Sequence, residues 1–334
     1  MSRRKGWGWC FLHACLLSGL GCSSAGRLDG PGERPSSHAS ATVTPHAIPA
    51  VAVEPAPRPQ AEKPAAAKPL APPYDLAADI EARRQQAIEQ LGPRTDVELV
   101  EGTFVVAAPG GKRALAGAVD VTRRALSAYF NGRFAKRPTR AISVYLFPTA
   151  GPYDAFCKNS GGSACISPYG FYTHAERRIV MNVGPGIGTL THELIHPLVE
   201  SDFPNAPDWI NEGIASLFEH FYFSAPGEIH GSKNWRHPRL AQALRSKTER
   251  HEASLPTLFG LSDDVFRGER EDLNYASARF LCQWLDQKQL LWPFYQRWRD
   301  NYENDRSGAQ AFAAVVGKTP AEADSEWSQW VLRL

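Results

Sequence analysis

The sequence predicts an α+β fold, with a small mixed or antiparallel sheet in the N-terminal half and a mostly helical C-terminal half. Three patterns support this prediction. Residues 97–107 and 142–147 alternate in polarity as strands do. Residues 170–172 and 178–183 flank a polar turn and indicate a hairpin. From residue 189 onward, apolar side chains recur at helical spacing. A chain of 334 residues is long enough to bury a substantial core.

The N-terminus predicts export. A basic start at residues 3–5 precedes a short apolar stretch at residues 7–20, so residues 1–21 are interpreted as a signal peptide. The stretch is too short for a comfortable membrane-spanning helix. The sequence LSGLGC, ending at Cys22, resembles a bacterial lipoprotein lipobox. Two interpretations remain, a membrane anchor through lipid on Cys22 or cleavage by the general signal peptidase, and both place the protein in the cell envelope or periplasm.

Three further regions follow the signal peptide. Residues 22–73 are rich in Ala, Pro, Ser and Gly without apolar periodicity, which predicts a disordered tether. Residues 74–94 have a helical pattern that ends at Gly92-Pro93, and we expect this helix to dock on the folded domain. Residues 95–334 form that domain. A helix-like pattern at 114–130 separates its first two strands.

Charge and cysteine content restrict the function classes. The chain has 37 basic and 35 acidic residues, dispersed along the sequence, which argues against nucleic-acid binding. In an oxidising compartment Cys157 and Cys165, close together around a glycine turn, are a plausible disulfide pair. Cys282 lies in a helical apolar pattern and is interpreted as a buried small side chain. A cysteine zinc site is disfavoured because these cysteines show no CxxC spacing.

The chemistry is concentrated in one motif, His192-Glu193-Leu194-Ile195-His196. Histidines four residues apart share one helix face, so both imidazoles can bind one tetrahedral ion. Glu193 lies beside that face, where its carboxylate can reach a metal-bound water without binding the metal. A second predicted helix, which begins near residue 207, supplies Glu212 as the natural third ligand. Two imidazoles and a carboxylate suit Zn²⁺ best.

The sequence HELIH followed by WINEGIA resembles the gluzincin zinc metallopeptidases, most closely the peptidase-MA-like families. This resemblance implies a zincin-like domain in which Glu193 is the general base and then the general acid. It also implies that Tyr275 stabilises the oxyanion, and Asn211 beside the third ligand fits the pattern. The metal ligands it implies are His192, His196 and Glu212.

The predicted function is a zinc-dependent peptidase of the cell envelope in which Glu193 activates a zinc-bound water. We expect the peptide or protein substrate to extend along the strand at residues 178–183. Two alternatives remain. The same site can hydrolyse a non-protein amide, or the chain can be a catalytically silent lipoprotein with a structural metal that acts as a binding or scaffold module. A structural site would be closed by a fourth protein ligand.

Four other residues carry expectations. Pro197 has no N–H to donate to the carbonyl of Glu193, so it should kink or weaken the motif helix. Glu200 and Ser216 are candidate partners for the outer nitrogens of the histidines. Arg279 is a candidate for binding a peptide carboxylate.

Overall fold

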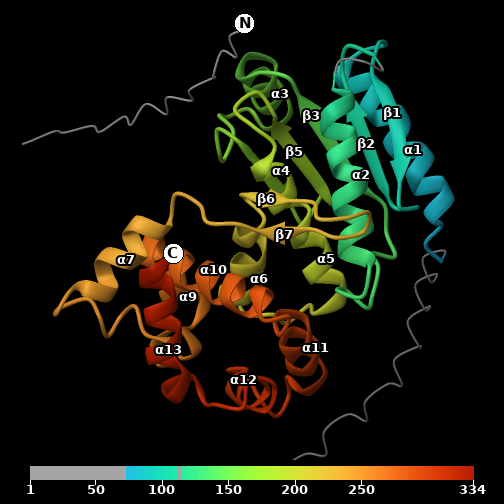
Figure 1. Ribbon diagram of the computed structural model, residues 1–334. Coiled ribbons are helices and arrows are strands. Elements are labelled where there is room, and N and C mark those ends of the chain that lie inside the picture. The colour runs from blue at the N-terminus through green and yellow to red at the C-terminus, as the bar shows by residue number, and fades with distance from the viewer. Residues whose placement is uncertain (1–72, 112–114) are drawn as a thin grey trace, which may run out of the picture. The chain divides into compact units, whose positions relative to one another are not determined.

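The computed structural model describes residues 73–111 and 115–334 (Figure 1). The predicted signal peptide, the lipidation site at Cys22 and nearly all of the tether lie outside these residues. The strands are β1 (Asp96–Val100), β2 (Phe104–Ala108), β3 (Ile142–Phe147), β4 (Gly170–Thr173), β5 (Arg178–Asn182), β6 (Phe221–Tyr222) and β7 (His230–Gly231). The helices of the N-terminal half and the motif region are α1 (Leu76–Leu91), α2 (Ala116–Phe130), α3 (Ala150–Gly161), α4 (Gly188–Glu193), α5 (Ile195–Asp202) and α6 (Asp208–Leu217). The remaining helices are α7 (His237–Arg245), α8 (Leu255–Phe259), α9 (Asp263–Phe266), α10 (Glu271–Gln287), α11 (Leu291–Asn301), α12 (Ala309–Val316) and α13 (Pro320–Arg333).

The main sheet has the order β1-β2-β3-β5-β4. The pairs β2–β3 and β3–β5 are parallel, whereas β1–β2 and β4–β5 are antiparallel. The predicted α+β class, with a mixed sheet in the front half and helices in the back half, is confirmed. The prediction of a single strand at residues 97–107 was wrong, because the chain turns at Glu101 and Gly102, whose φ angles are 49° and 75°.

The strand at residues 178–183, which the sequence analysis predicted to pair with a peptide, is not at the edge of the sheet. Strand β5, which overlaps the predicted substrate strand, is hydrogen-bonded on both sides, to β3 and to β4. Its backbone therefore has no free edge for a peptide. The free edge on this side of the sheet belongs to β4, which also contacts α4.

Side chains of the sheet alternate between two helical layers. Val144 and Leu146 of β3 point into a core shared with α2 and the helical half, whereas Tyr145 and Phe147 point into a second core with α1 and α3. Ala87 of α1 is fully buried in that second core, so the first helix docks on the sheet. The result is a three-layer arrangement in the N-terminal half (Figure 1).

In the helical half, α6 packs against the long helix α10 (Figure 1). Gly213 allows this close approach, because a Cβ atom there would lie 3.0 Å from Sγ of Cys282 and 3.1 Å from the carbonyl oxygen of Ala278. Trp209 at the start of α6 stacks on Trp298, with ring centroids 5.1 Å apart. The start and the middle of α6 are therefore fixed by a well-packed core.

The motif helix is divided in two. Helix α4 ends at Glu193, Leu194 lies between the helices, and α5 begins at Ile195. The missing N–H of Pro197 explains the break, because it removes the bond that would reach the carbonyl of Glu193. Leu194 keeps helical angles, φ −65° and ψ −25°, so both histidines remain on one face.

The chain from residue 188 onward is mainly helical, as the periodicity from residue 189 predicted, whereas the short helices α8 and α9 and the two-residue pair β6–β7 were not predicted. Such short elements carry little periodic signal. Within residues 73–111 and 115–334, we find no helix long and apolar enough to cross a membrane.

Candidate metal centre

The motif residues and Glu212 meet between α4, α5 and α6. One potential ligand atom from each of His192, Glu193 and His196 lies within 4.8 Å of the others. Glu212 joins the group from α6, with its Oε2 atom 3.4 Å from Nε2 of His192. We call these four side chains the metal cluster. They are 7 to 14% exposed, so the cluster lies just beneath the surface and is accessible from it.

Both histidines turn their Nε2 atoms inward and their Nδ1 atoms toward supporting groups. Nδ1 of His196 lies 3.1 Å from Oδ1 of Asn211, so Nδ1 carries the proton and Nε2 is free to bind a metal. Nδ1 of His192 faces Oε1 of Glu219 at 3.5 Å but is buried without a hydrogen-bond partner. An imidazole whose outer nitrogen is held by an oxygen atom, as in His196, is typical of protein metal sites.

The two oxygens of Glu212 have different surroundings. Oε1 accepts a hydrogen bond of 2.8 Å from Nη2 of Arg267, which also pairs with Asp208. Oε2 is buried without a hydrogen-bond partner and faces the Nε2 atom of His192. A buried carboxylate oxygen without a partner is costly, and a cation at this point would remove the cost.

The cluster is rich in negative charge that stabilises a cation. Burial disfavours the charged form of His192, but the nearby carboxylates of Glu212 and Glu219 outweigh it and raise the pKa of His192 to about 10. Burial likewise opposes ionisation of both glutamates, yet His192 and their arginine partners hold their pKa values well below the usual range. In the metal-free protein, a proton on His192 therefore partly fills the role of a cation.

Tyr275, at the start of α10, lies beside the cluster. Its hydroxyl oxygen accepts a hydrogen bond of 2.9 Å from Nη1 of Arg267. Burial and the carboxylate of Glu212 raise the pKa of Tyr275, so the phenol keeps its proton at neutral pH. Because Arg267 occupies a lone pair of the oxygen, the hydroxyl proton remains available for donation to another group.

Two hydrogen bonds hold the helices of the cluster together. The hydroxyl of Tyr129 in α2 donates to the carbonyl of Thr191 in α4 over 3.2 Å. The hydroxyl of Thr191 in turn donates to the carbonyl of Phe218, directly after α6, over 2.6 Å. These residues are fully buried, so α4 and α6 keep a fixed relative position.

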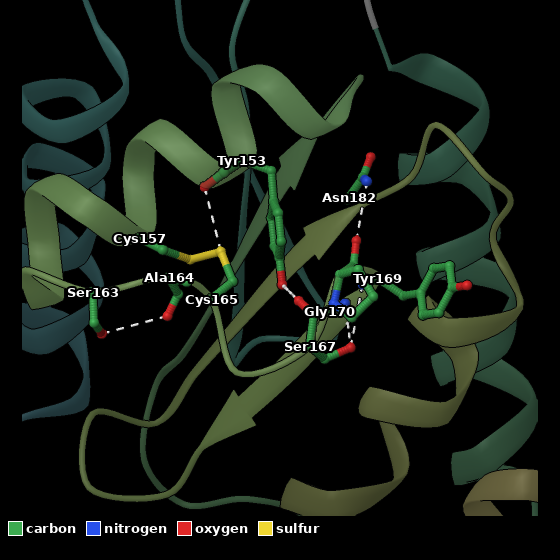
Figure 2. Close-up of a disulfide and its surroundings, with 10 residues drawn as sticks. Tyr153, Cys157, Ser163, Ala164, Cys165, Ser167, Tyr169, Gly170 and Asn182 are labelled. Atoms are coloured by element: carbon green, nitrogen blue, oxygen red, sulfur yellow. Dashed lines mark hydrogen bonds between the residues drawn. A yellow bond between two sulfur atoms is a disulfide. The ribbon is translucent and has the colours of Figure 1, made fainter. Parts of the chain in front are cut away.

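A cross-linked segment precedes the edge strand β4 (Figure 2). Cys157 and Cys165 form a disulfide, as their spacing suggested. The segment after it is held by Tyr153, whose hydroxyl donates to the carbonyl of Ser167 over 2.6 Å. Burial raises the pKa of Tyr153, and the negative charge of Glu193 adds to the effect. The disulfide thus stabilises the approach to the edge strand β4.

Three secondary expectations fail. Glu200 pairs with Tyr172 and His174, away from the motif histidines. The hydroxyl of Ser216 is buried and has no hydrogen-bond partner. Arg279 is fully buried and donates to Gln283 and to the carbonyl of Ser232, so it is not available to a peptide carboxylate.

Two supporting residues were missed from the sequence. Glu219 follows Glu212 by seven positions, which is the spacing of one helix face, so a signal existed in the sequence. Arg267 had no such signal, because it lies in the connection between the short helix α9 and α10 and reaches the cluster only through the tertiary fold.

The donor set fits a divalent metal such as zinc: two inward Nε2 atoms, a carboxylate oxygen without a partner, and outer groups that orient each ligand. A scan against protein-family models and a search of curated proteins give no match to this chain.

Proposed function

We propose that the chain is a zinc-dependent peptidase of the gluzincin type, in which His192, His196 and Glu212 hold the metal. The observation that carries this proposal is the buried Oε2 atom of Glu212, which has no hydrogen-bond partner and lies 3.4 Å from Nε2 of His192. A zinc ion at such a site lowers the pKa of water and polarises a substrate carbonyl.

The residues of the chain provide the proton transfers. Glu193 lies beside the ligands, with Oε2 3.7 Å from Nε2 of His196, and is the general base that takes a proton from the attacking water. It then returns that proton to the leaving amine. The protonated hydroxyl of Tyr275 donates a hydrogen bond to the oxyanion, while Arg267 holds the phenol in place.

The free edge of β4 is the most suitable position for an extended peptide. A peptide that pairs with β4 would satisfy its unpaired backbone groups and pass beside α4, which β4 contacts. This assignment replaces β5, whose two edges are already paired. We also propose that the protein is exported to the cell envelope and held at the membrane through Cys22, which rests on the sequence of residues 1–22 alone.

One observation favours a second function. Glu193 belongs to the same group of potential ligand atoms as the two histidines. If Glu193 binds the metal together with Glu212, four protein ligands close the coordination shell and the chain is a binding module with a structural metal.

The test compares cleavage of a mixed peptide library by the zinc-loaded full-length protein and by its Glu193→Gln variant. A peptidase cleaves, and Glu193→Gln keeps zinc but loses at least about a hundredfold in rate, as expected for the loss of a general base. Loss of zinc in Glu193→Gln together with no cleavage by the wild type would support the structural-metal function instead.

A further inference from the structure

The two most exposed large apolar side chains among the described residues are Ile166, 83% exposed, and Trp235, 71% exposed. Single exposed apolar residues are common and need no explanation by themselves. These two differ from the others in their location. The segment of Trp235 is hydrogen-bonded to Glu219, which faces His192, and the segment of Ile166 leads to β4, which contacts α4.

Trp235 lies between two residues that bind the same carboxylate. The side-chain amide of Asn234 donates to Oε2 of Glu219 over 2.9 Å, and Arg236 donates to both oxygens over 2.9 and 3.1 Å. Glu219 is the residue 3.5 Å from Nδ1 of His192. The backbone around Trp235 is therefore fixed relative to a proposed metal ligand, although its indole is exposed to solvent.

One face of the indole is covered. The guanidinium of Arg236 lies 4.2 Å from the centroid of the Trp235 ring and 5.0 Å from that of Tyr275, so it lies between the two rings. This contact places Trp235 at the side of the cluster where Tyr275 lies. An indole that is held rigidly and remains mostly exposed loses little conformational entropy on binding an apolar group.

Ile166 belongs to the disulfide-bonded segment that leads to β4 (Figure 2), where Tyr153 binds the neighbouring Ser167. Strand β4 in turn contacts α4, the helix that carries His192 and Glu193. Tyr169, from the same segment, is 52% exposed. Large apolar side chains are thus exposed on two segments, one hydrogen-bonded to Glu219 and one leading to β4, and a substrate with large apolar side chains suits them.

We propose that Trp235 is a specificity-determining residue that binds a large apolar, preferably aromatic, side chain of the substrate. The substrate class is then an extended peptide that carries exposed aromatic or aliphatic residues, as segments of unfolded proteins do. This inference rests on the proposed function only for the cleavage of that peptide and not for its binding.

The test measures binding and cleavage of two pools of short labelled peptides by the zinc-loaded full-length protein. Both pools contain Ala, Gly, Ser, Lys and Glu, and one pool also has a single Phe where the other has Ala. Binding is followed by fluorescence polarisation in the Glu193→Gln variant. We expect a preference of about tenfold for the Phe pool, which Trp235→Ala abolishes and Trp235→Phe largely keeps.

Tyr222→Ala is the matched control, because Tyr222 is 54% exposed and lies on β6, where it stacks on His230. It should keep the full preference. An absent preference, or one that survives Trp235→Ala, would overturn the inference. Binding of the Phe pool without cleavage by the wild type would contradict the proposed peptidase function and leave the role of Trp235 intact.

Discussion

Removing the charge of Glu219 should weaken metal binding without touching a metal ligand. Oε1 of Glu219 lies 3.5 Å from Nδ1 of His192, the ring nitrogen that faces away from Glu212. Burial opposes ionisation of Glu219, but His192 and Arg236 lower its pKa to about 2, so the carboxylate is ionised. In Glu219→Gln the imidazole loses this negative partner. Loss of such a group lowers metal affinity by about 10- to 100-fold, or roughly 1.4 to 2.8 kcal/mol.

The same substitution breaks the ion pair between Glu219 and Arg236. Both side chains are mostly buried, with 15% and 14% of their surface exposed. Breaking a pair at this depth costs about 3 kcal/mol of folding free energy. A control must therefore separate metal binding from stability. Asp202→Asn supplies it, because Asp202 is fully buried and pairs with Arg299 at 2.8 and 3.0 Å, and neither residue belongs to the metal cluster or contacts it.

Zinc affinity is measured by competition with a chromophoric chelator, and stability by urea unfolding in the presence of a strong chelator. We expect both variants to lose stability and only Glu219→Gln to lose zinc affinity. Equal zinc affinities for wild type, Glu219→Gln and Asp202→Asn would refute the role assigned to Glu219.

Three further predictions follow from other parts of the structure. Gly213→Ala should destabilise the fold by about 1 to 3 kcal/mol in urea unfolding, because the new Cβ atom would lie 3.0 Å from Sγ of Cys282; unchanged stability would show that α6 and α10 are less tightly packed. Replacing Cys157 and Cys165 by Ser should lower the free energy of unfolding by about 2.5 kcal/mol, given their separation of 8 residues, and reductant should have this effect on the wild type alone. Because the pKa of His192 is raised to about 10 without metal, zinc must displace a proton from His192 at neutral pH. The apparent affinity for zinc should therefore rise by up to about tenfold per pH unit toward pH 10. Calorimetry in buffers of different ionisation enthalpy should detect the released proton, and a zinc affinity that does not depend on pH would contradict this prediction.

The sequence was most informative where one periodic pattern decides the outcome. The helical spacing of His192 and His196 places both imidazoles on one face, and the structure brings Oε2 of Glu212 within 3.4 Å of Nε2 of His192, next to the motif as the sequence suggested. The break in the motif helix also follows from one residue, because Pro197 lacks the N–H that would close it.

The sequence was least informative where distant segments meet. Strand order depends on tertiary pairing, so the pattern at residues 178–183 could not reveal that β5 is internal and that β4 has the free edge. Arg267 reaches Glu212 from a position 55 residues later in the chain, and no local pattern predicts that contact. The sequence suggested that Arg279 could bind a peptide carboxylate, but its side chain is fully buried.

The most direct test of the account is the zinc content of the purified full-length protein and of its Glu212→Ala and Glu193→Gln variants, measured by elemental mass spectrometry. We expect about one zinc ion per chain in the wild type and in Glu193→Gln, and almost none in Glu212→Ala. A wild type without zinc, or zinc retained in Glu212→Ala and lost in Glu193→Gln, would contradict the assigned ligands.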